Sequence, residues 1–258
     1  DDSTFFAFAN TVKARSFEKR DECHGWIGIR LQATPKSPPD DIILHIRLLD
    51  DANIEQQEAL GILGVNLIYG AYHYAGTPER LLRSLMDNLK WGRVEIDLVE
   101  FSGPTLGVID NRLMALELVK ASLTPAVLFD PEGKVVIPAE ALYRQSVLGI
   151  RGEFRPVSKT EMGMVEHATE RFLTQPSVAR STMVVLAEMT MADLANDGEI
   201  DTVDFLARVL ELRTLGYHVL ISEFFRYFRV RQYLARYTKE PVAIVTDVAG
   251  LGQIVRDD

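Results

Sequence analysis

Arg226 and Arg229 are the side chains whose positions most clearly indicate a ligand. Both fall at the start of an expected helix over 226–237, where the helix dipole disfavours cations unless an anion lies nearby. Arginine presents a planar fork of donors that suits a carboxylate or a phosphate. The partner of these arginines is therefore expected to be either an acid of this chain, such as Glu223, or a bound anion.

A pair of glycines marks a second possible phosphate site. In "TDVAGLGQ" (246–253), Gly250 and Gly252 stand where a strand enters a helix. Glycines at such a point let the backbone approach a phosphate, and the helix N-terminus supplies amide donors. The dinucleotide-binding fingerprint would need a third glycine where the chain has Val255. A tight strand-to-helix turn is the simpler explanation of the pair.

A third candidate lies in "FSGPTLGVIDNR" (101–112). Ser102 ends an expected strand, and Asp110 and Arg112 begin an expected helix. Ser102 and Arg112 could face a phosphate or a carboxylate. The simpler reading is that Asp110 caps the helix.

Acidic residues offer two possible metal sites. Asp247 ends the last expected strand and would hold Mg²⁺ if the protein transfers a phosphoryl or nucleotidyl group. The segment 193–204 partly fits a calcium-binding loop, but its third position is Ala195 and its twelfth is Asp204, which is short for a bidentate ligand. A turn followed by a helix N-cap explains the same segment.

The histidines and the single cysteine do not form a recognisable site. Cys23 and His24 are adjacent, but zinc usually needs at least three protein ligands. His45 and His218 fall within expected strands, so we expect them in the core or at a sheet edge.

Alternating strands and helices must position these residues. Apolar runs rich in β-branched residues indicate strands, and amphipathic runs with capping residues indicate helices. The expected strands are 25–33, 42–49, 93–101, 126–129, 183–189, 218–222 and 242–247, and the expected helices are 3–17, 59–76, 77–89, 110–123, 161–174, 202–217 and 226–237. This alternation predicts an α/β fold with a mainly parallel, three-layer, Rossmann-like sheet.

The same pattern suggests where the chain divides. Residues 1–150 form an expected N-terminal α/β half, which includes a β-hairpin near 126–137 with its turn at Asp130 to Gly133. Residues 151–180 are an expected junction, and residues 181–258 an expected C-terminal βαβαβ half. The arrangement allows two similar βαβαβ halves.

Composition excludes several classes of partner. The formal net charge of the 258 residues is -9, which disfavours nucleic acids and anionic membranes, because both bind basic surfaces. Residues 59–76 carry no formal charge, but their glycines, Asn66 and His73 make the run too polar to span a bilayer. One cysteine allows no intrachain disulfide. We therefore expect a cytoplasmic protein.

Three segments resemble a bacterial protein family without an assigned activity. They are "QQEALGILGVNLIYGA", "FSGPTLGVIDNRLMALELV" and "DFLARVLELRTLGYHVLISEFFRYFRVRQYLARYT". Members carry two conflicting names, TonB-dependent receptor and nicotinate-nucleotide adenylyltransferase. The first implies an outer-membrane barrel, whereas this pattern is α/β, and the second implies a histidine nucleotide signature that is missing near the first strand. The resemblance therefore implies a coherent family and transfers no catalytic residue.

Open α/β sheets bind ligands beyond the carboxyl ends of their strands. We therefore expect a phosphorylated or nucleotide-like small anion to bind at that edge, with phosphoryl or nucleotidyl transfer as a further step. The expected ligand-binding residues are Ser222, Arg226, Arg229, Asp247, Gly250 and Gly252 from one half and Ser102, Asp110 and Arg112 from the other. The alternative is a non-catalytic scaffold, a homo-oligomer in which the helix around 61–70 packs on its mate.

Overall fold

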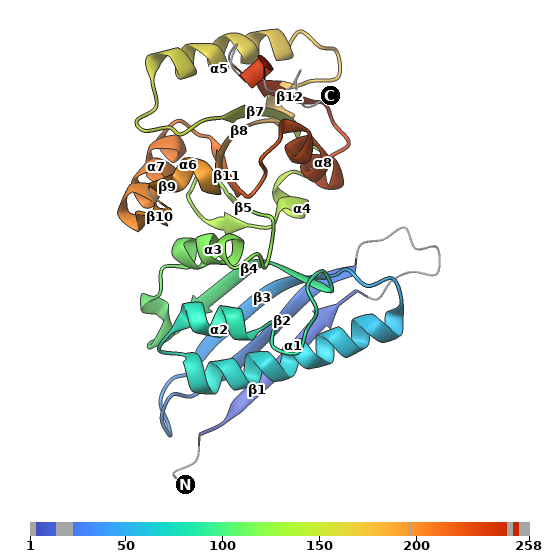
Figure 1. Cartoon of the computed structure of the whole chain (residues 1–258), viewed down its shortest axis with the longest axis vertical. Coiled ribbons are helices and arrows are strands. Elements are labelled where there is room, and N and C mark those ends of the chain that lie inside the picture. Colours follow the sequence, from blue (N-terminus) through green and yellow to red (C-terminus); the bar gives the residue numbers. More distant parts are fainter. Residues whose placement is uncertain (1–3, 14–22, 197, 247–249, 253–258) are drawn as a thin grey trace. The chain divides into compact units, whose positions relative to one another are not determined.

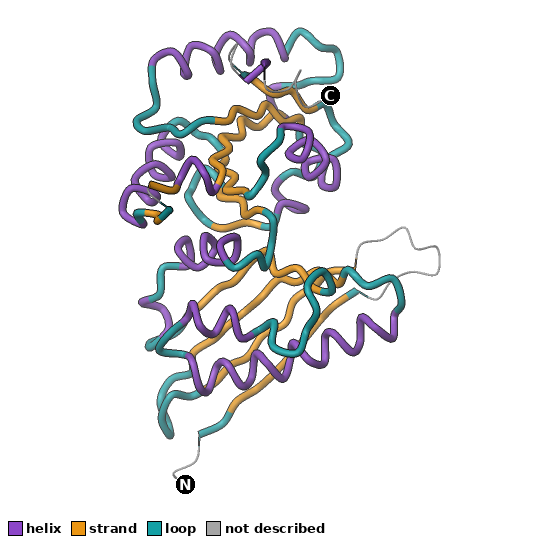
Figure 2. The backbone as a smooth tube through the Cα atoms, in the orientation of Figure 1, coloured by secondary structure: helices purple, strands orange, loops and turns teal. Residues whose placement is uncertain are grey.

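The chain forms two compact units, residues 1–124 and 125–258. The computed structural model describes residues 4–13, 23–196, 198–246 and 250–252 (Figure 1). Each unit has a β-sheet of its own with helices packed against it (Figure 2).

The first unit is built on a four-stranded antiparallel sheet. Its strands follow the order β1 (Phe6–Val12), β2 (Cys23–Leu31), β3 (Asp40–Leu48) and β4 (Val94–Ser102). Three helices cover one face of this sheet (Figure 1). They are α1 (Asn53–Tyr74), α2 (Pro78–Ser84) and α3 (Asn111–Lys120), and a short 3-10 turn spans Leu106–Val108.

Alternation along the strands separates the two faces of this sheet. On β2 every second residue from Cys23 to Leu31 is buried, whereas the residues that alternate with them are half-buried or exposed. Successive side chains of a strand point to opposite faces, so the buried set marks the face under the helices. A β-bulge between His45 and Ile46 shifts this alternation, because β4 contributes one extra residue, Asp97.

The second unit is built on a six-stranded mixed sheet. The order is β12 (Val242–Val245), β7 (Ser146–Arg151), β8 (Met183–Thr190), β11 (His218–Ser222), β5 (Ala126–Phe129) and β6 (Val135–Val136). The first four of these run parallel, whereas β5 and β6 are antiparallel to their neighbours. The helices are α4 (Pro138–Ala141), α5 (Lys159–Phe172), α6 (Met191–Leu194), α7 (Thr202–Thr214) and α8 (Tyr227–Tyr237), and a two-stranded ribbon joins β9 (Ala195–Asn196) and β10 (Glu199–Ile200).

The expectation of a mainly parallel, three-layer, Rossmann-like fold is wrong. Among the described residues, antiparallel neighbours outnumber parallel ones, and the two units do not repeat one βαβαβ pattern. The reason lies between β3 and β4, where two helices follow each other instead of one. The chain returns to the end where β3 finished, as the bond from Leu49 N to Arg93 O (2.9 Å) shows. The next strand must then run antiparallel.

The N-terminal segment also differs from expectation. The sequence predicts a helix over 3–17, and the structure has β1 at Phe6–Val12. This strand pairs along its full length with β2. Pairing with a neighbouring strand outweighs local helix propensity, which is a weak preference in tertiary context.

Along the chain the first unit ends at Thr124 and the second begins at Pro125, whereas the sequence places a junction at 151–180. The turn at Asp130 to Gly133 does join two antiparallel strands, with Gly133 at φ +77°. Because β5 also pairs with β11, this hairpin belongs with the C-terminal residues. No helix within the described ranges is long and apolar enough to cross a membrane.

Candidate functional site

Helix α8 has a buried face and an exposed face. Val230, Tyr233, Leu234 and Tyr237 are buried and pack against Leu220 and its neighbours in the sheet. Their spacing of three and four residues is the one that places side chains on a single helical face. The spacing in the sequence predicts a buried stripe of Tyr227, Val230, Leu234 and Tyr237, whereas the structure buries Tyr233 and leaves Tyr227 half-buried. The arginines therefore lie on the remaining surface of the helix.

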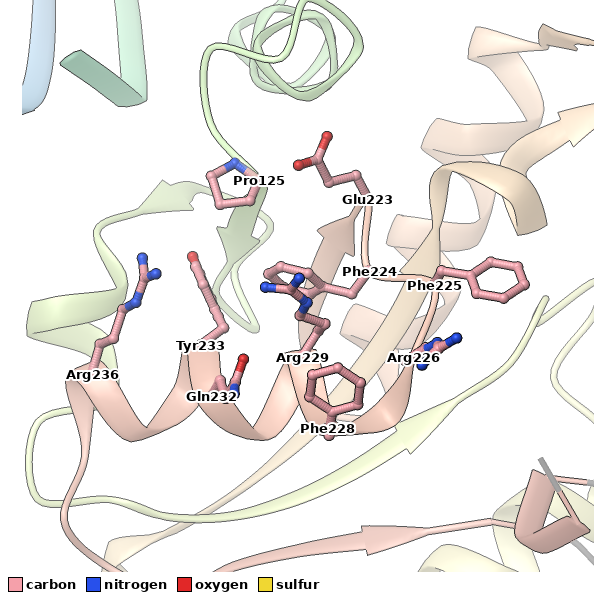
Figure 3. Close-up of a pocket in the computed structure, with 10 residues that line it drawn as sticks. All are labelled: Pro125, Glu223, Phe224, Phe225, Arg226, Phe228, Arg229, Gln232, Tyr233 and Arg236. Atoms are coloured by element: carbon pink, nitrogen blue, oxygen red, sulfur yellow. The ribbon is translucent and has the colours of Figure 1, made fainter. Parts of the chain in front are cut away.

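A pocket of about 540 Å³ follows this exposed surface and the loop that precedes it. It belongs wholly to the second unit and begins directly after β11. Three arginines and several aromatic rings form its walls, and Glu223 is the only acid among its described lining residues (Figure 3). The lining residues are Pro125, Glu223, Phe224, Phe225, Arg226, Phe228, Arg229, Gln232, Tyr233 and Arg236.

Arg229 and Arg236 are the charges that define this pocket. They stand two helical turns apart, about 10 Å along the axis, and in Figure 3 they point to the same side as Tyr233. Neither forms an ion pair with any described residue, although the Arg229 guanidinium lies 5.5 Å from the ring centre of Phe228. Arg226 also lines the pocket, but in Figure 3 its guanidinium points away from the other two. The wall along α8 is therefore positively charged.

Glu223 does not neutralise these arginines. Its carboxylate forms no ion pair with any residue that the structure describes, so it is not the partner that the sequence suggested for Arg226 and Arg229. Partial loss of hydration raises the pKa of Glu223 above its ordinary value. The pocket thus combines Arg229 and Arg236, which form no ion pair with a described residue, with one separate acid.

A buried polar cluster holds the loop that enters the pocket. The Ser222 hydroxyl donates to Glu188 (2.6 Å) and accepts from the Phe224 amide (3.3 Å). Arg151 donates to both oxygens of Glu188 at 3.0 Å. Burial raises the pKa of Glu188, and the bonds from Arg151 and Ser222 oppose that rise. Ser222 therefore holds the loop in place through these hydrogen bonds and is not among the residues that line the pocket.

Arg151 also reaches the loop directly. Its third nitrogen donates to the carbonyl of Phe225 (3.3 Å), and its guanidinium lies 4.5 Å from the ring centre of Tyr227. The Tyr227 hydroxyl is 3.2 Å from that of Thr246, just beyond β12. Residues at the carboxyl ends of β7, β8, β11 and β12 are thereby linked, and their contacts fix the backbone that precedes α8.

The three predicted site residues of the first unit have structural roles. Asp110 is the N-cap of α3 and accepts from the Arg112 amide (2.9 Å). The guanidinium of Arg112 pairs with the same carboxylate (2.6 Å) and lowers the pKa of Asp110. Ser102 is the last residue of β4. These residues lie in the first unit, whereas the pocket belongs to the second.

The predicted residues near the C-terminus are only partly described. Asp247 lies outside the described residues, so its expected role as a Mg²⁺ ligand stays a prediction. Gly250 and Gly252 lie in a helical segment, described over residues 250–252. Neither glycine is among the residues that line the pocket.

The segment 193–204 is used for structure. Asp193 completes a capping box with Thr190 at the start of α6. Asp204 pairs with Arg155 (2.6 Å) and with Arg208. These pairs account for both acids without a calcium ion, and no group of three or more His, Cys, Asp or Glu side chains arranged for a metal occurs in the described part of the chain.

The structure reveals one cluster that the sequence did not indicate. On the face of the first sheet opposite the helices, His24 Nδ1 lies 3.0 Å from His45 Nε2, and His45 Nδ1 lies 2.5 Å from Asp97. His45 and Asp97 are buried, and the second oxygen of Asp97 bonds to no described residue. These residues are far apart in sequence, so only the register of β2, β3 and β4 brings them together.

Comparison with known proteins identifies no relative. No protein-family model matches the chain, and neither does any curated protein or solved structure. The function must therefore be inferred from the geometry of the pocket along α8.

Proposed function

We propose that the second unit binds a phosphorylated or nucleotide-like small anion in the pocket along α8. The observation that carries the proposal is the pair Arg229 and Arg236, which line one pocket and form no ion pair with a described residue. Guanidinium groups form strong, directional hydrogen bonds with phosphate oxygens. A phosphate bound between them would supply the anion that Arg229 lacks in the first turn of the helix.

The aromatic walls favour a ligand with a planar group beside its phosphate. Phe228 is 44% exposed and stands next to Arg229. Exposed aromatic rings next to arginines provide stacking surfaces for bases, and each such contact typically contributes about 1–3 kcal/mol. This feature supports nucleotide-like ligands over inorganic phosphate.

The test measures binding to the whole chain by calorimetry and thermal shift. The ligands are pyrophosphate, ribose 5-phosphate and adenosine monophosphate, each with and without Mg²⁺. We expect Arg229→Ala and Arg236→Ala each to weaken binding about tenfold, because each removes a charge-assisted contact worth roughly 1.5 kcal/mol. The affinity should also fall with rising ionic strength, because these side chains are exposed.

Arg231→Ala is the matched control. Arg231 is exposed on the same helix and does not line the pocket, so its loss should leave affinity within about twofold, as expected for a charge screened by solvent. Equal effects of all three variants would indicate a general charge effect and contradict the proposal. Absence of any binding would instead support the non-catalytic scaffold.

A further inference from the structure

The backbone of Glu223 is fixed at the edge of the pocket. Its amide donates to the carbonyl of Pro125 (3.0 Å), which ties it to the start of β5. On either side, the Ser222 hydroxyl accepts from the Phe224 amide, and Arg151 binds the carbonyl of Phe225. The backbone at Glu223 is therefore fixed by bonds that leave its carboxylate available to a ligand.

The carboxylate of Glu223 faces the same pocket as the arginines without pairing with them. In Figure 3 it lies beside Pro125, on the side toward which Arg229 and Arg236 point. It forms no hydrogen bond or ion pair with a described residue. The side chain is exposed at the edge of the pocket, and the partial burial that remains raises its pKa above the ordinary value. A carboxylate that forms no hydrogen bond or ion pair with a described residue is a strong acceptor for a ligand hydroxyl.

We propose that Glu223 selects ligands that carry hydroxyl groups beside the phosphate, so that the pocket takes sugar phosphates or nucleotides and discriminates against simple phosphates. This inference rests on the proposed function, because the arginines must hold the phosphate. In the bound state the phosphate lies against Arg229 and Arg236, and the sugar hydroxyls donate to Glu223. A phosphate without hydroxyls meets the same arginines and an acid that repels it.

Two features produce this selectivity. Sugar hydroxyls donate charge-assisted hydrogen bonds to the exposed Glu223 carboxylate, and a phosphate without hydroxyls cannot supply these bonds. Glu223 also repels the phosphate itself when no donor intervenes. Hydrogen bonds to Glu223 strengthen the binding of a sugar phosphate, and repulsion by Glu223 weakens the binding of a phosphate without hydroxyls. Both effects therefore favour the sugar phosphate.

The experiment compares two ligands of equal charge on the whole chain. Ribose 5-phosphate and methyl phosphate are both phosphate monoesters, and only the first carries sugar hydroxyls. We expect the wild-type protein to prefer ribose 5-phosphate about tenfold or more. In Glu223→Gln, ribose 5-phosphate should bind roughly 5- to 20-fold more weakly, and methyl phosphate up to about threefold more tightly.

Two further variants complete the design. Glu223→Asp keeps the charge but withdraws the carboxylate by one methylene, so it should weaken ribose 5-phosphate and leave methyl phosphate unchanged. Glu170→Gln removes an exposed acid from α5, outside the pocket, and should change neither affinity. Thermal unfolding of each variant checks that the fold is intact, and Glu223→Asp decides the question if Glu223→Gln does not fold.

Opposite shifts for the two ligands would support the role of Glu223. Equal shifts in Glu223→Gln, or equal affinities in the wild-type protein, would overturn it. If either of these results is found while both ligands bind and both lose affinity in Arg229→Ala, only the selectivity is refuted and the proposed anion site stands. If neither ligand binds the folded protein, or Arg229→Ala has no effect, the proposed function and this inference are both wrong.

Discussion

Asp110 and Arg112 show how one pair of side chains can resemble a ligand site and yet serve a helix. The pattern of serine, acid and arginine after a strand suggested an anion site, and the structure directs the arginine to the acid two residues earlier. The Arg112 guanidinium lowers the pKa of Asp110. The pair should therefore stabilise the first unit only while Asp110 is ionised.

Replacing Asp110 with Asn tests this role. Asn remains a good N-cap, so the variant removes the charge and keeps the cap. At pH 7 we expect a loss of about 0.2–1 kcal/mol in the free energy of unfolding. A lowered folded-state pKa gives stability that is present above the unfolded value of about 3.9 and is lost as pH falls through the folded value. The difference between wild type and variant should therefore disappear in acid.

Urea unfolding followed by tryptophan emission measures this difference. Both tryptophans, Trp26 and Trp91, belong to the first unit, so the signal reports on the unit that contains Asp110. A difference of the same size at pH 7 and pH 2.5 would show that the ion pair contributes nothing.

Of the predicted ligand-binding residues, Arg226 and Arg229 line the pocket of the second unit, whereas the polar cluster of the first unit was not predicted. Arg226 and Arg229 stand out because their place in one helix can be counted along the chain. His24, His45 and Asp97 meet only across three strands, and the bulge that adds Asp97 breaks the alternation from which a face is read. Spacing in sequence cannot reveal contacts that depend on register between distant strands.

At the scale of elements, close approach of β1 to β2 depends on a residue without a side chain. A Cβ on Gly25 would lie within 2.6 Å of the Val12 Cα and would also overlap the Thr11 carbonyl oxygen. Both neighbours are backbone atoms, which cannot rotate away as a side chain would. The pairing of β1 therefore requires glycine at this position.

Gly25→Ala should destabilise the first unit by about 1–3 kcal/mol or more, because overpacking forces the backbone to shift. Gly61→Ala is the matched control, since Gly61 lies in α1 with nothing within 4 Å of an added Cβ. That change should stabilise the unit by about 0.5–1 kcal/mol, as alanine loses less entropy than glycine in a helix. The difference in urea midpoint between the two variants gives the measurement, and equal midpoints would contradict the contact at Gly25.

Most of the expected strands and helices exist, but their directions were not predictable from the chain alone. Residues 126–129 and 218–222 are strands as expected, because short apolar runs between turn signals are a local feature. Whether two strands run parallel depends on how many helices lie between them and where those helices return the chain. In the sequence, α1 and α2 appear as one uncharged run followed by a capped helix. That pattern does not show that the chain turns back between them and returns to the end of β3.

At the scale of the whole molecule, the position of the unit boundary decides which fragments can fold. Cutting after Thr124 leaves both sheets intact, whereas cutting after Ile150 separates β5 and β6 from β11. We expect residues 1–124 and 125–258 each to unfold cooperatively in circular dichroism. We expect fragments 1–150 and 151–258 to aggregate, because each then exposes strand edges that are paired in the whole chain. Cooperative unfolding of both fragments of the second pair would place the boundary elsewhere.

Cys23 lies on the covered face of β2, 2% exposed, and it is the only thiol of the chain. A buried thiol reacts with an alkylating reagent only after local or global opening. The rate of its modification therefore records how often the first sheet opens, without interference from the second unit. The molecule thus contains its own kinetic probe, positioned under the helices that must move before the core meets solvent.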